Sequence, residues 1–182
     1  MRIAMLSMAL GLTGCVPSLQ PLYTEKDTVF DPALVGVWQK EKETWTLGAG
    51  EGRAYEVTMK PEKGPAAGFE AHLVQLGKAR FLDLYPEERD EDNAFYEFHR
   101  IPAHSISRIW LEGDTLRVAM LQDRWLADRI RSGQVQIGHE FVGPKRDAVI
   151  LTAPTPQLQA LVMRYADDTK AFADPEKYRR VK

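Results

Sequence analysis

The stretch that decides the fold is HSISRIWLEGDTLRVAM, residues 104–120. His104 to Leu111 has the composition of a β-strand, and apolar residues recur at every second position from Leu116 to Met120. The intervening Glu112-Gly113-Asp114 suits a tight turn, so the stretch predicts a β-hairpin. Because hairpin-length connections join antiparallel strands, it indicates an antiparallel sheet.

The same pattern continues on both sides of this hairpin. Further short strands are predicted at residues 35–39, 43–47, 55–59, 69–76, 80–85, 94–101, 134–142 and 148–151. Asp123 suits the cap of a helix that ends at Gly133, and Thr155-Pro156 opens a last helix with one apolar face. The predicted fold class is mainly β with two short α-helices. We expect a curled antiparallel sheet or a barrel, with the C-terminal helix packed against it.

The composition is that of one ordinary folded domain. The chain has 182 residues, of which 44% are hydrophobic and 27% charged, and its formal net charge is −2. A disordered chain would have fewer apolar residues and a larger net charge. A general nucleic-acid-binding protein would carry a basic stripe, so nucleic acid is not an expected partner.

The N-terminus has the features of a secretory signal peptide. Met1-Arg2 supplies a positive start, and Ile3 to Leu12 is an apolar run broken only by Ser7 and Gly11. Ten helical residues extend about 15 Å, whereas a membrane core is about 30 Å thick, so the run is too short to span it. We expect residues 1–14 to be removed as a signal peptide.

Leu12-Thr13-Gly14-Cys15 resembles the lipobox of bacterial lipoproteins, which is a branched aliphatic residue, a small residue, Gly or Ala, and Cys. The resemblance implies that the Cys15 sulfur receives a diacylglycerol through a thioether. It also implies cleavage between Gly14 and Cys15, followed by acylation of the new amine. Several acyl chains on one residue would hold the protein at a membrane, because each buried methylene contributes about 0.8 kcal/mol.

Val16 extends this resemblance to a location. In lipoproteins of Gram-negative envelopes, an Asp after the Cys favours retention in the inner membrane, and its absence favours the outer membrane, facing the periplasm. Cys15 is the only Cys of the chain, which suits an oxidising compartment. We therefore expect an outer-membrane lipoprotein that faces the periplasm.

The mature chain divides into a tether and a domain. Residues 15–30 contain Pro17 and Pro21 and few periodic apolar positions, so a lipidated Cys and an extended tether are expected there, with partial packing of the second half. Asp31 and Pro32 suit the cap and the first position of a single helical turn. Residues 31–182 are expected to form one globular β-rich domain.

Gly36 and Trp38 lie at the start of that domain, in Leu34-Val35-Gly36-Val37-Trp38. This segment resembles the Gly-x-Trp opening of lipocalin-like barrels. In that family the Gly allows close packing at the closed end of the barrel, and the Trp plugs that end. The resemblance implies a barrel, for which a small apolar ligand is one candidate occupant.

Five aromatic residues are candidates for lining a binding pocket, although such residues more often form the core: Trp38, Trp45, Tyr55, Phe69 and Trp110.

The sequence contains no catalytic signature. The four histidines, His72, His99, His104 and His139, lack the spacing of a metal site, so neither a metal nor a cofactor is expected. We therefore expect a membrane-anchored, non-catalytic binding domain whose partner is a small apolar ligand or an envelope protein. The alternative is a periplasmic hydrolase with an active site that the sequence does not reveal.

Overall fold

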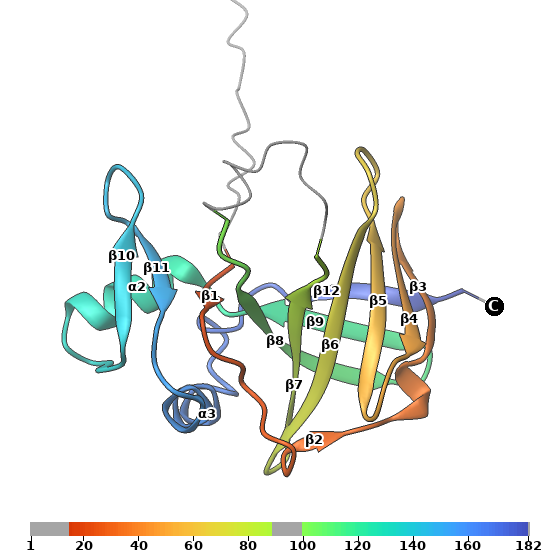
Figure 1. The fold of residues 1–182 in the computed structure, drawn as a ribbon, viewed down its shortest axis with the longest axis horizontal. Helices are drawn as coiled ribbons and strands as arrows, with labels where there is room; N and C mark the ends of the chain where they lie inside the picture. Colours follow the sequence, from red (N-terminus) through yellow and green to blue (C-terminus); the bar gives the residue numbers. More distant parts are fainter. Residues whose placement is uncertain (1–14, 89–99, 182) are drawn as a thin grey trace, which may run out of the picture.

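The strands of the chain close into a ring. The computed structural model describes residues 15–88 and 100–181. Eight of its strands form an antiparallel barrel (Figure 1). They are β3 (Gly36–Lys40), β4 (Glu43–Ala49), β5 (Ala54–Lys60), β6 (Ala67–Leu76), β7 (Ala79–Pro86), β8 (His104–Glu112), β9 (Thr115–Met120) and β12 (Glu176–Arg180). The ring is closed because β12 pairs with both β3 and β9, and β9 also pairs with β8.

Two tight turns set the register of neighbouring strands. Gly77 has φ 58° between β6 and β7, and Gly113 has φ 59° between β8 and β9. Residues with a Cβ rarely adopt this conformation, so the glycines allow short connections. The resulting pairs include Gln75 opposite Arg80 and Glu112 opposite Thr115.

Alternate residues of the barrel strands point inward and fill its interior. Trp38, Trp45, Tyr55 and Tyr178 are each at most 3% exposed and belong to this interior cluster. The other buried members are Leu34, Leu47, Val57, Ala71, Leu73, Leu82, Leu84, Ile109, Leu116 and Val118. Aromatic and aliphatic side chains thus occupy the centre of the ring.

A second apolar layer covers one outer face of the barrel. It is built by β1 (Pro17–Ser18), α2 (Asp123–Arg131), β10 (His139–Val142), β11 (Ala148–Leu151) and α3 (Thr155–Arg164), on the left of Figure 1. Phe81 and Ile106 of the barrel belong to the same buried cluster as Leu126 of α2 and Leu158 of α3. The short β2 (Thr28–Val29) pairs with β6, and η1 (Pro32–Leu34) precedes β3.

Arg180, the last residue of β12, seals one end of the barrel. Its guanidinium carbon lies 4.3 Å from the centroid of the Trp38 ring, and the guanidinium donates to the Val35 carbonyl at 2.8 Å and to the Ala33 carbonyl. Gly36 has φ +145°, and a Cβ at this position would collide with the guanidinium. These contacts explain why a glycine and a tryptophan stand at the two positions.

The predicted fold class is confirmed. The chain is mainly β with two α-helices, its antiparallel sheet is closed as in a lipocalin-like barrel, and α3 packs in the outer apolar layer. The predicted turn also forms, since the Asp31 side chain accepts a hydrogen bond from the Ala33 N–H and Pro32 occupies the first position.

Several segments differ from the prediction. The sequence did not indicate β12, and strand structure over residues 134–142 is confined to β10. Of the strand predicted at residues 94–101, residues 94–99 lie outside the described residues, and residues 100–101 are not in a strand.

Residues 15–30 pack on the domain from Val16 onward, whereas the sequence suggested an extended tether of which only the second half packs partly. Val16 and Leu22 are fully buried in the outer apolar layer. β1 pairs with β8 and β11, and β2 pairs with β6. Apolar side chains in an otherwise irregular segment thus gain burial by packing between the barrel and α3.

Candidate functional site

Cys15 lies at the barrel end opposite to Arg180. Its backbone forms an antiparallel bridge with Gln122, two residues beyond the end of β9. Because neighbouring strands alternate in direction, this end also holds the β3–β4 and β5–β6 connections, the end of β7 and the start of β8. We call it the anchor end, and we call the end sealed by Arg180 the closed end.

The side chain of Cys15 is half-buried. Its sulfur lies 3.9 Å from the Val16 carbonyl oxygen. Burial raises the pKa of the thiol to about 11, with a further increase from the Asp123 carboxylate and an opposing effect of a hydrogen bond with Ser105. A thiol with such a pKa is protonated at neutral pH and is a poor nucleophile. The thiol of the docked segment is therefore less reactive than an exposed one.

The other lipobox residues, Leu12, Thr13 and Gly14, lie outside the described residues.

Residues 15–23, which we call the strap, are fastened to several elements. The Leu19 N–H donates to the Leu151 carbonyl of β11 at 2.9 Å. From α3, the Thr155 hydroxyl donates to the Pro21 carbonyl at 2.7 Å. The Gln159 amide donates to the Leu22 carbonyl at 2.9 Å. The strap is therefore held by its backbone as well as by buried apolar side chains.

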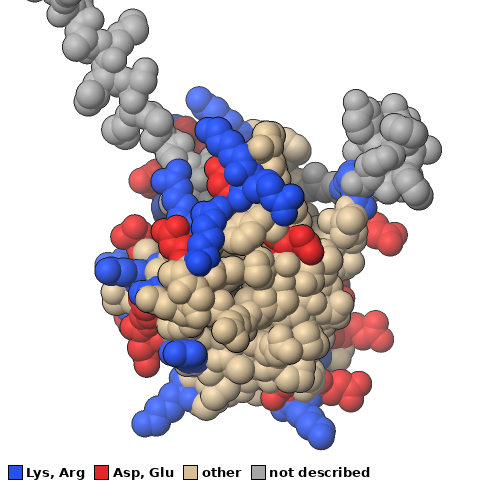
Figure 2. All heavy atoms as spheres, turned by 90° about the vertical axis from the view of Figure 1, so that its left-hand side faces the viewer, with Lys and Arg blue, Asp and Glu red and all other residues tan. Residues whose placement is uncertain are grey.

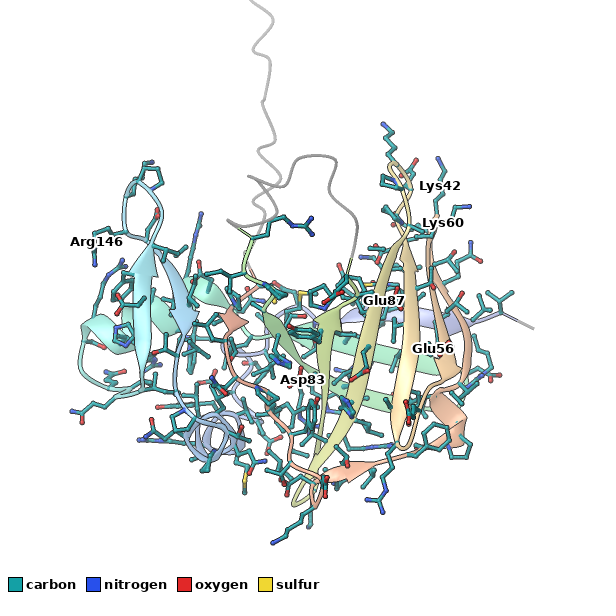
Figure 3. The ribbon with its side chains drawn as sticks, in the orientation of Figure 1. Lys42, Glu56, Lys60, Asp83, Glu87 and Arg146 are labelled. Carbon is teal, nitrogen blue, oxygen red and sulfur yellow. The ribbon has the colours of Figure 1, made fainter. Side chains whose placement is uncertain are left out.

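A buried Asp–His pair also holds the strap. Asp83 of β7 is 1% exposed, and it lies beside the strap in Figure 3. One carboxylate oxygen accepts from the Leu22 N–H at 2.6 Å, and the other lies 2.7 Å from Nδ1 of His104 on β8. Sequence reasoning missed Asp83, because 61 residues separate it from Leu22 and no local pattern marks the contact.

Aromatic rings surround this pair. Tyr23 of the strap stacks on His72 with ring centroids 3.8 Å apart, and the Tyr85 ring lies 4.6 Å from His104. Burial, followed by the Asp83 and Glu70 carboxylates, raises the pKa of the Tyr23 phenol. These ring contacts help to hold the strap against the outer face of the barrel.

The geometry of the Asp–His pair suits fastening better than nucleophilic catalysis. Ser18 lies opposite His104 in the strand register, but its hydroxyl donates to the Gln20 carbonyl at 2.7 Å. In the part of the chain that the structure describes, no hydroxyl or thiol is hydrogen-bonded to His104. An Asp–His pair without a nucleophile lacks the central element of a catalytic triad.

The candidate pocket aromatics divide between two locations. Trp38, Trp45 and Tyr55 belong to the packed barrel interior, and Phe69 packs against the same cluster while partly exposed. Trp110 lies on the outer face, where the guanidinium carbons of Arg108 and Arg117 are 4.9 and 4.8 Å from its ring centroid. The structure therefore does not gather the five residues around one pocket.

The outer layer contains a shallow groove that the sequence did not reveal. It has a volume of about 190 Å³ and lies between α3 and the segment before β10. Its lining residues are mostly apolar or uncharged: Val135, Gln136, Ile137, Gln157, Ala160, Leu161, Arg164 and Tyr165. Figure 2 shows this side of the molecule with an uncharged central area and charged residues around it.

The histidines do not converge on a metal site. His72, His104 and His139 form separate hydrogen bonds, with Glu70, Asp83 and the Ile137 carbonyl respectively. His99 lies outside the described residues. Over residues 15–88 and 100–181, no group of three or more His, Cys, Asp or Glu side chains has the arrangement of a metal site.

No family model, curated protein or solved structure matches this chain. In the described part of the chain, neither helix has the length and apolar character needed to cross a membrane.

Proposed function

We propose that this chain is a lipid-anchored envelope protein with a non-catalytic binding domain. The observation that carries the proposal is Leu12-Thr13-Gly14-Cys15 directly after a short apolar run. The position of Cys15 supports it, because the residue is half-buried at one end of the barrel and not enclosed in its core. By resemblance to Gram-negative lipoproteins, the location proposed is the outer membrane, facing the periplasm.

The binding partner that we favour is another envelope protein. The barrel interior is occupied by Trp38, Trp45, Tyr55 and Tyr178, which leaves little support for carriage of an apolar ligand there. Sites for small ligands usually measure about 300–1,000 Å³. The groove beside α3 is smaller and mostly uncharged, so it suits one or two side chains of a protein partner. A second hollow of about 390 Å³ beside Trp110 falls within that range, but its lining includes Asp167, Asp168 and Asp174, which do not suit an apolar ligand.

Intact mass of the membrane fraction tests the anchor. We expect the wild-type chain to begin at Cys15 and to carry the added mass of acyl chains, whereas Cys15→Ser keeps residues 1–14 and gains no mass. Thr13→Ser preserves the lipobox pattern and serves as the matched control, which should be processed normally. A wild-type protein that begins at Met1 without acyl mass would refute the proposal, and density separation of the membranes tests the outer-membrane location.

Site-specific photo-crosslinking tests the partner. Gln157 of α3 lines the groove and is exposed, whereas Glu51 is exposed in the β4–β5 turn. A photoreactive amino acid at position 157 is expected to capture a defined envelope protein, and the same amino acid at position 51 is not. Native mass spectrometry that shows a retained small ligand and no protein partner would favour ligand binding instead.

The hydrolase alternative rests on the Asp83–His104 pair. If His104 acts as a base, the purified wild-type protein hydrolyses an activated ester, and folded His104→Ala has lost that activity. Equal background rates for the two proteins would remove this alternative.

A further inference from the structure

We propose that lipidated Cys15 holds the domain directly against the bilayer in one orientation, with the anchor end at the lipid headgroups and the closed end away from them. This inference rests on the proposed lipidation of Cys15. It adds an interaction surface to that proposal, and the partner of this surface is the lipid bilayer itself.

The first argument is the absence of a spacer between the acylated residue and the folded body. Cys15 bridges to Gln122, and the next residue, Val16, is already fully buried. If residues 15–23 were free and extended at about 3.1 Å per residue, they would allow the domain to move about 25 Å from the bilayer. The docked strap does not extend, so it adds no distance between the domain and the bilayer. The acyl chains on Cys15 are therefore attached directly at the surface of the domain.

The second argument is an apolar side chain at the same end. Ile101 is 75% exposed, the highest value among the described large apolar side chains. It precedes β8 by three residues, and β8 begins at the anchor end. Ile101 can lose contact with water by entering the interfacial region of a bilayer. The closed end has no apolar side chain of equal exposure among the described residues, since Val181, next to Arg180, is 45% exposed.

Charged side chains surround this end, but they do not determine the orientation. Figure 3 shows Lys42, Lys60 and Arg146 toward the upper edge of the molecule, at the tips of hairpins. Lys42 is paired with Glu62 at 2.6 Å, and Glu87 lies just beyond β7. Because the charge at this end is mixed, the orientation is determined by the positions of the acyl chains and of Ile101. The basic side chains at the hairpin tips can bind lipid phosphates next to the site of insertion.

Depth-dependent fluorescence quenching tests the orientation. Because lipidation converts the only thiol into a thioether, an introduced Cys can be labelled alone. We choose Ile101→Cys and Lys42→Cys at the anchor end, with Lys78→Cys and Glu51→Cys as exposed controls at the closed end. The lipidated proteins are placed in phosphatidylethanolamine–phosphatidylglycerol vesicles that carry a nitroxide on the headgroup.

We expect loss of fluorescence at positions 101 and 42 and none at positions 78 and 51. β7 has eight residues, and with a rise of about 3.3 Å per residue and a tilt of about 40° the two ends lie about 20 Å apart. A spacer of twelve Gly and Ser residues between Cys15 and Val16 adds a flexible length of about 20 Å. It is expected to remove the difference between the two ends.

Two results are distinguishable. Equal quenching, or equal absence of quenching, at both ends of a protein whose mass confirms acylation overturns the orientation and leaves the proposed anchor intact. A protein without acyl mass that does not bind the vesicles overturns the proposed anchor, and the orientation with it.

Discussion

At Gly36 the absence of a side chain lets the Arg180 guanidinium lie against the backbone and cover Trp38. The sequence singled out Gly36 and Trp38 by resemblance alone. The partner, Arg180, lies in a charged C-terminal segment, and no local signal connects it to residue 38.

We expect Gly36→Ala to lower the free energy of unfolding by about 1–3 kcal/mol, because it combines an unfavourable φ with a collision. Urea denaturation measures the change. Gly48→Ala is the matched control, since its Cβ would lie 3.8 Å from the Glu56 carbonyl oxygen, an ordinary contact. If the two variants are equally stable, Arg180 does not occupy this position.

Cys15 supplies a prediction that depends on pH. With a thiol pKa of about 11, the unlipidated folded protein has about one thiolate in a thousand molecules at pH 8, against about one in four for an ordinary thiol of pKa 8.5. Alkylation by iodoacetamide is therefore expected to be slow and to rise about tenfold per pH unit between pH 7 and 9.5. In denaturant the alkylation rate should level off near pH 8.5–9. If the rate levels off in that range without denaturant as well, the strap is undocked in the folded protein.

The raised thiol pKa also affects stability. Since the unfolded state loses the thiol proton first, folding becomes less favourable as the pH rises from about 8.5 toward 11.

Among the elements, those with a regular apolar pattern were predictable and those held by remote contacts were not. β8 and β9 have apolar residues facing the core and a turn glycine between them, and both were predicted. β12 is Glu-Lys-Tyr-Arg-Arg, in which Tyr178 alone is fully buried, so its pattern indicates no strand. Its place is fixed by pairing with β3 and β9, which are far away in sequence.

The strap depends on Asp83 in the same long-range manner. We expect Asp83→Ala to reduce the free energy of unfolding by about 1–3 kcal/mol, because it leaves the Leu22 N–H and His104 without their buried acceptor. Hydrogen exchange of residues 16–23 should also accelerate. Glu56→Ala removes an exposed carboxylate from β5 and is the control. Unchanged exchange in the Asp83 variant would contradict the role of the pair in fastening the strap.

For the whole molecule, the sequence predicted a curled or closed antiparallel sheet because its hairpin spacing leaves few other arrangements. It indicated partial packing of the second half of residues 15–30 but not docking from Val16 onward, since that docking depends on Val16 finding space between separate elements. The aromatic residues were predicted as either core or pocket, and only the three-dimensional packing distinguishes the two.

A chain that ends at Pro175 tests the closure of the ring. Loss of β12 removes Tyr178 from the interior and leaves β3 and β9 with unpaired edges. We expect the truncated chain to lose its cooperative thermal transition and to associate as its concentration rises, because open edges pair with other strands. Addition of a peptide covering residues 173–182 should reverse the association, and a truncated monomer with the wild-type melting temperature would argue against this role of β12.

The pairing of β12 with β3 has a consequence for biosynthesis. A ribosome delivers residue 36 long before residue 180, so seven strands of the ring exist before the strand that completes it. Loop closure over such a separation is slow, and during this interval the nascent sheet is exposed to aggregation. The ring can therefore close only after β12 has emerged from the ribosome or, for an exported chain, from the translocation channel, and we expect a chaperone that shields strand edges to raise the yield.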